Sequence, residues 1–87
     1  MAMAGNGLVK LIEECGELSQ IAAKKMAYPD VDDHPDGKGS MKLRMEEEIA
    51  DVIAACGFIS EKFNLDSDAI LKRATVKHNL FNKWDKE

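Results

Sequence analysis

The chain of 87 residues is poor in the residue types that build sheets or cross-linked folds. It has one Trp, one Tyr, three Phe, two Cys and two Pro. Val and Thr are also scarce, whereas Leu, Ile, Ala, Met and Glu are common. Because β-branched and aromatic residues favour strands and long unbranched residues favour helices, this composition predicts an all-α fold.

Further absences narrow the class of protein. The sequence has no apolar run near the roughly 18 residues of a membrane span, and no signal-peptide pattern. With a net charge of −4 it also lacks the basic patch and aromatic series typical of nucleic-acid binding. Cys15 and Cys56 are widely spaced and fall in apolar arcs, so we expect buried, reduced thiols in a cytoplasmic protein, with a disulfide as the minority alternative.

The hydrophobic pattern predicts one domain, residues 1–87, with three helices. We predict that residues 1–6 form a flexible N-terminus and that residues 28–40, which include both prolines, form a loop. The three helices are expected over residues 7–27, from the cap Ser40 to about Phe63, and from Asp66 or Ser67 to about Lys86. Their apolar stripes are wide for a single chain, so we expect an antiparallel bundle of about three helices, completed by oligomerisation.

The predicted loop is rich in aspartate. Its acidic residues do not follow the EF-hand order, since His34 and Pro35 stand where a ligand and the obligatory glycine belong. We interpret residues 28–40 as a solvated, mobile connection, with closure over a substrate as the alternative.

Two acidic pairs stand out within the helical patterns. Glu14 and Glu17 are three residues apart, as are Glu48 and Asp51, so each pair faces one direction on its helix. On helical wheels Glu14 and Glu48 lie inside the apolar stripes, near the edge. The pairs fall at similar heights in an antiparallel hairpin, because Glu17 is ten residues before the first predicted helix ends and Glu48 eight after the second begins.

Four carboxylates that converge on an apolar seam repel one another unless a cation lies between them. All-oxygen ligands suit Mg²⁺, with Mn²⁺ as a substitute. We therefore predict a magnesium site at Glu14, Glu17, Glu48 and Asp51. Di-iron and zinc sites fit less well, because the required histidines and clustered cysteines are missing.

Three basic residues are candidates for binding phosphate. Lys10 and Arg44 each precede a predicted ligand by four residues, so a plain i,i+4 ion pair is the alternative for each. Lys77 lies in the apolar stripe of the third predicted helix. It either reaches the metal site from there or extends its ammonium group to solvent.

The motif Glu13-Glu14-x-x-Glu17 followed by Glu48-x-x-Asp51 resembles the signature of the MazG-like all-α nucleoside triphosphate pyrophosphohydrolases. The similarity spans residues 8–63, with a longer gap between the motifs than is usual. The resemblance implies a dimeric or tetrameric bundle that cleaves an NTP or dNTP, with Mg²⁺, to the monophosphate and pyrophosphate. It also implies that Glu14, Glu17, Glu48 and Asp51 are the catalytic metal ligands and that Lys10 and Arg44 can touch the triphosphate.

Two other functions stay open at this point. The chain is either a non-enzymatic helical oligomerisation or adaptor module with a polar seam, or a hydrolase of another pyrophosphate-containing molecule. The sequence does not single out the general base. Residues that can stack on a nucleobase are Trp84, Phe58 and Tyr28, although core packing explains the first two equally well.

Overall fold

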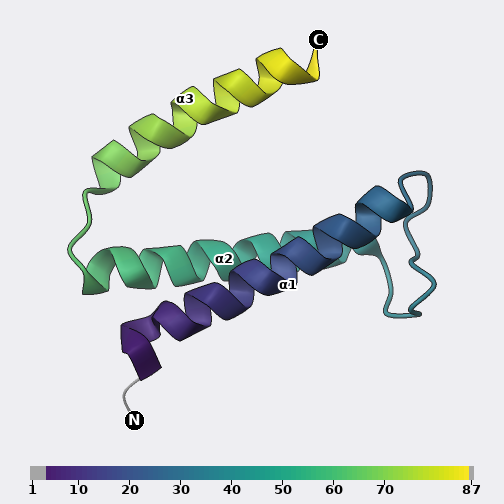
Figure 1. Cartoon of the computed structure of the whole chain (residues 1–87), viewed down its shortest axis with the longest axis horizontal. Coiled ribbons are helices and arrows are strands. Elements are labelled where there is room, and N and C mark those ends of the chain that lie inside the picture. The colour runs from purple at the N-terminus through teal and green to yellow at the C-terminus, as the bar shows by residue number, and fades with distance from the viewer. Residues whose placement is uncertain (1–3, 87) are drawn as a thin grey trace.

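The computed structural model describes residues 4–86, and every regular element in that range is helical (Figure 1). The all-α prediction with three long helices is therefore confirmed. The elements are a short 3₁₀ helix η1 (Ala4–Gly7), α1 (Leu8–Ala27), α2 (Met41–Lys62) and α3 (Ser67–Asp85). The predicted flexible N-terminus lies partly outside the described residues, and its described part belongs to η1.

The predicted helix boundaries follow from local chemistry. The Ser40 hydroxyl accepts the Leu43 amide at 3.2 Å, and the Asp66 carboxylate accepts the Ala69 amide at 3.0 Å. These side chains satisfy amide groups that the first turn of a helix leaves without partners. Asn64, at φ 52°, reverses the chain after α2 in the left-handed region that Asn tolerates.

A close approach of backbone and side chain secures the start of α1. Gly7 adopts φ 90°, and a Cβ built on it would lie 2.6 Å from Cε1 of Phe58. Only glycine accepts both the positive φ and the ring of Phe58 at that distance. The contact ties the N-terminal turn to α2.

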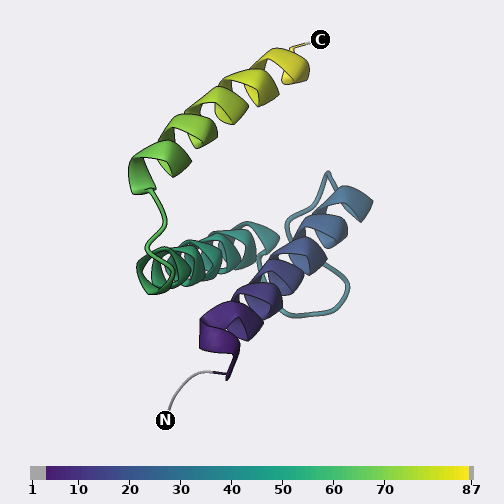
Figure 2. The same cartoon turned by 60° about the vertical axis from the view of Figure 1, so that its left-hand side comes forward.

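The helices α1 and α2 form an antiparallel hairpin whose core is small. Ile21, Met41 and Ile59 are its buried apolar side chains among the described residues, and Met41 is completely inaccessible. Figures 1 and 2 both show α1 lying across α2, with residues 28–40 closing one end. The hairpin is the part of the fold that positions the acidic pairs.

The third helix is separate from the hairpin. In both views α3 turns away after residues 63–66 and does not pack along α1 or α2 (Figures 1 and 2). The three helices are thus present, but within the described chain they form a hairpin and an arm rather than a closed bundle.

Apolar surface is left uncovered by this arrangement. Ile12 is 72% exposed and Ile53 66% exposed, and Phe81 and Trp84 on α3 are also exposed. The prediction that Cys15 and Cys56 are buried is wrong for the single chain, because they lie on these uncovered faces; both are free thiols. None of the helices within residues 4–86 is long and apolar enough to cross a membrane.

Candidate metal centre

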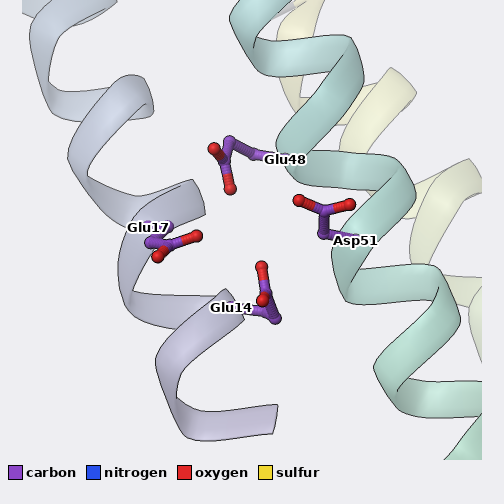
Figure 3. A group of neighbouring side chains, drawn as sticks. All are labelled: Glu14, Glu17, Glu48 and Asp51. Carbon is purple, nitrogen blue, oxygen red and sulfur yellow. The ribbon is translucent and has the colours of Figure 1, made fainter. Parts of the chain in front are cut away.

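The structure brings the four predicted carboxylates together across the α1–α2 seam. Glu14 and Glu17 project from α1 toward Glu48 and Asp51 of α2 (Figure 3). One carboxylate oxygen from each of the four residues lies within 4.8 Å of those of the others. The matching helical phase of the two pairs produces this convergence, as the sequence predicts.

The cluster is partly withdrawn from solvent. Glu14 is buried, with 7% of its surface exposed, and Glu17 and Glu48 are partly buried. The Oε2 atoms of Glu14 and Glu48 are inaccessible and have no hydrogen-bond partner within the described residues. A buried carboxylate oxygen is stabilised by a hydrogen bond or a positive charge, so these two oxygens are available to accept a proton donor or a cation.

The charges of the cluster act on one another. The Glu14 carboxylate raises the pKa of Glu17 above its ordinary value, and burial and the Glu48 carboxylate add to that rise. Like charges disfavour ionisation of their neighbours, and a bound cation would reverse this effect.

The donor set fits a hard divalent cation. All four side chains offer oxygen, which Mg²⁺ and Mn²⁺ prefer. Glu14 and Glu48 present the two oxygens without partners, and Glu17 and Asp51 complete the group from one helical turn further along α1 and α2. We conclude that these four residues can hold such an ion.

Lys10 lies beside the cluster in an ion pair. Its ammonium group is 3.2 Å from Oε1 of Glu13 and 3.4 Å from Oε1 of Glu14. The hydrogen bond to Glu13, followed by that to Glu14, raises the pKa of Lys10. The i,i+4 pair offered as the alternative for Lys10 is therefore present.

Arg44 has a different partner from the one the sequence suggested. Instead of Glu48, the guanidinium contacts the carboxylate of Asp36 from the loop at residues 28–40, with both donor–acceptor distances 3.1 Å. The Lys24 ammonium donates to the same carboxylate at 2.8 Å. Spacing in the sequence could not reveal this pairing, since it depends on the course of the loop.

The loop itself is well anchored and is more than a solvated connection. The Asp32 carboxylate accepts the Lys42 amide at 2.9 Å, and the Asp32 carbonyl accepts the Met41 amide at 2.8 Å. The Lys25 ammonium donates to the Val31 carbonyl at 3.0 Å. These bonds hold the loop against the ends of α1 and α2.

Lys77 lies apart from the carboxylates. It projects from α3, with its ammonium 5.7 Å from the centre of the Phe81 ring. Because α3 turns away from the hairpin, the chain does not bring Lys77 to the cluster (Figure 2). Trp84, on the same helix, contacts Phe81 with ring centres 5.5 Å apart.

The contacts of Asp36 with Lys24 and Arg44, which we call the Asp36 clamp, predict a specific dependence of stability on pH. Hydrogen bonds from Lys24 and then Arg44 hold the pKa of Asp36 far below its ordinary value of 3.8. Its stabilising effect is therefore present above pH 3.8 and is lost as the pH falls through the pKa of the folded state. We expect Asp36→Asn to be less stable than wild type near neutrality, by a margin that shrinks below pH 3.8.

Urea unfolding at a series of pH values measures this margin. Asp33→Asn removes the same charge from a neighbouring side chain for which the described residues supply no ion pair, and serves as the control. If the difference in unfolding free energy between wild type and Asp36→Asn stays constant below pH 3.8, the Asp36 clamp is contradicted.

Comparisons of the chain with protein-family models, curated proteins and solved structures found no match. The resemblance to the MazG-like family therefore depends on the acidic motifs alone.

Proposed function

We propose that this protein is a Mg²⁺-dependent nucleoside triphosphate pyrophosphohydrolase that converts an NTP or dNTP to the monophosphate and pyrophosphate. The observation that carries the proposal is the convergence of four carboxylates with two buried oxygens that lack partners. A purely structural polar seam would pair or solvate those oxygens. The MazG-like motif supplies the reaction class.

Glu14, Glu17, Glu48 and Asp51 would hold the metal. When bound, the ion would neutralise charge on the triphosphate and polarise the phosphoryl group under attack. Mn²⁺ would substitute for Mg²⁺, because both accept oxygen ligands in octahedral geometry.

The residues of the chain then have separate tasks. A carboxylate of the cluster accepts a proton from the attacking water, whose oxygen forms a bond to the α-phosphorus. The bond between the α-phosphorus and the bridging oxygen breaks, and pyrophosphate leaves with the electron pair of that bond. Lys10 stands at one side of the cluster and Arg44 at the other, where their charges can attract the substrate's phosphates.

The proposal includes a homo-oligomer, a dimer or tetramer, in the cytoplasm. The exposed apolar faces of α1, α2 and α3 support association, since contiguous apolar surface of this kind marks protein contacts. Two free thiols and the lack of a disulfide in the described chain are compatible with a reducing compartment.

Release of pyrophosphate from the common NTPs and dNTPs tests the function. The assay couples an inorganic pyrophosphatase to phosphate detection, and high-performance liquid chromatography identifies the monophosphate product. We expect release with Mg²⁺ and none with a chelator, for at least one nucleotide. Failure with the whole panel in Mg²⁺ and in Mn²⁺ would refute the proposal.

A further inference from the structure

A cavity of about 270 Å³ adjoins the carboxylate cluster on the side of the loop. It is lined by Glu17, Gln20, Ile21, Lys24, Arg44 and Glu48. One end thus carries two of the cluster's carboxylates and the other end carries two cations. An anion that also contacts the carboxylate end through a metal ion would find opposite charge at both ends.

The two cations already hold an anion that belongs to the protein. The Asp36 carboxylate accepts hydrogen bonds from Nη1 and Nη2 of Arg44 and from the Lys24 ammonium, and both of its oxygens take part. The side chains of Asp36, Lys24 and Arg44 are 18%, 31% and 20% exposed, so these contacts are shielded from water more than ordinary surface pairs. The planar two-oxygen contact with Arg44 is one that a phosphate group makes equally well.

The Asp36 carboxylate carries less negative charge than the two cations that it contacts directly. Lys24 and Arg44 carry two positive charges, whereas the Asp36 carboxylate supplies one negative charge. The Asp36 amide donates to Nδ1 of His34 at 2.9 Å, which helps to orient the loop around this carboxylate. A phosphate group with up to two negative charges and three acceptor oxygens would match the pair of cations more completely.

The bonds that hold the base of the loop are separate from those that hold Asp36 at its tip. The bonds of Asp32 and Lys25 hold the base and do not involve Asp36. Beyond Asp36, Gly37 (φ 73°) and Gly39 (φ 95°) have open space around them. Glycine accepts many backbone conformations, so these two positions allow the tip to change its course once the contacts of Asp36 are released.

We infer that Lys24 and Arg44 form a binding site for the phosphate groups of a polyphosphate, that Asp36 occupies this site in the free protein, and that the ligand displaces Asp36 and releases the tip of the loop. The inference rests on the proposed function for the identity of the ligand. The loop would therefore act as a latch that competes with substrate.

Titration with inorganic pyrophosphate in the presence of a chelator tests the site without metal or turnover. Removing the internal competitor by Asp36→Asn should tighten pyrophosphate binding about tenfold if the latch is closed roughly nine-tenths of the time. Asp33→Asn, which removes an equal charge from the same loop, should tighten it far less. Arg44→Gln and Lys24→Gln should each weaken binding, and Asp36→Asn should bring a smaller gain in the Arg44→Gln background, where Asp36 still pairs with Lys24.

Limited proteolysis reports the movement of the loop. Lys38 lies between the two loop glycines, and its amide donates to Oδ1 of Asp36 at 3.1 Å. Pyrophosphate should therefore accelerate trypsin cleavage after Lys38, up to about tenfold, because cleavage follows the open population. Mass spectrometry identifies the cut. A ligand that leaves the clamp intact would protect this bond instead.

These outcomes separate the latch from the proposed activity. Weaker or unchanged pyrophosphate binding by Asp36→Asn, or protection of Lys38, would overturn the latch even if the protein hydrolyses nucleotides. Tighter binding and faster cleavage would support the latch even in a protein that fails the nucleotide panel.

Discussion

Glu48→Gln should abolish the proposed pyrophosphate release while leaving the helical fold intact; this is the largest effect that we expect. The amide keeps the size of the side chain but removes the charge that a metal ligand needs. Turnover should fall at least about 100-fold, the upper end of the effect of losing groups that merely orient ligands. Glu14→Gln should behave in the same way, since its Oε2 is the other buried oxygen without a partner.

The same substitution has an opposite effect on the metal-free protein. Removing one of four repelling carboxylates should raise the melting temperature measured by circular dichroism in a chelator. Millimolar Mg²⁺ should then stabilise wild type, because a ligand of the folded state favours folding, and should have little effect on Glu48→Gln.

Glu47→Gln is the matched control. Glu47 is the exposed neighbour on α2 and is not part of the carboxylate cluster. Its substitution should preserve turnover and the response to Mg²⁺. Wild-type turnover in Glu48→Gln or Glu14→Gln would refute the assignment of the cluster as catalytic, and a wild-type protein without any shift in Mg²⁺ would favour an adaptor module.

Ile12→Glu should convert the proposed oligomer to monomers, the second large effect. Ile12 is 72% exposed on α1, on the same apolar arc as Cys15 and Met26. A charge without a partner in a buried contact costs at least about 3 kcal/mol, which weakens association about 100-fold or more. Light scattering and sedimentation velocity measure the change in mass.

Ile12→Met serves as the control, because it keeps an apolar side chain of similar volume and should leave the assembly intact. The melting temperature of wild type should rise with protein concentration, and that of Ile12→Glu should not. An unchanged mass for Ile12→Glu would contradict the proposal that this face of α1 joins two copies.

Most of the correct predictions depend on local sequence patterns, namely helix caps and the spacing of residues along one helix. Ser40 and Asp66 cap their helices as expected, and the three-residue spacing correctly pairs Glu14 with Glu17 and Glu48 with Asp51. Each of these features depends on neighbours within one helix or one hairpin. Helical periodicity encodes them directly.

The features that the sequence did not predict depend on contacts between parts of the chain that are distant in sequence. The partner of Arg44 is set by the path of a loop with several equivalent aspartates, among which only Asp36 reaches it. The thiols of Cys15 and Cys56 lie on apolar arcs that no part of the described chain covers. The helical pattern identifies an apolar face, but not whether the same chain or another copy covers it.

The separation of α3 from the hairpin has an evolutionary consequence. All four carboxylates come from α1 and α2, and residues 63–66 connect the arm without packing it against them. Mutations that change the length or sequence of α3 therefore leave the carboxylate geometry as it is. Evolution can therefore alter the arm, including its exposed apolar side chains, without altering the spacing of the four carboxylates within one chain.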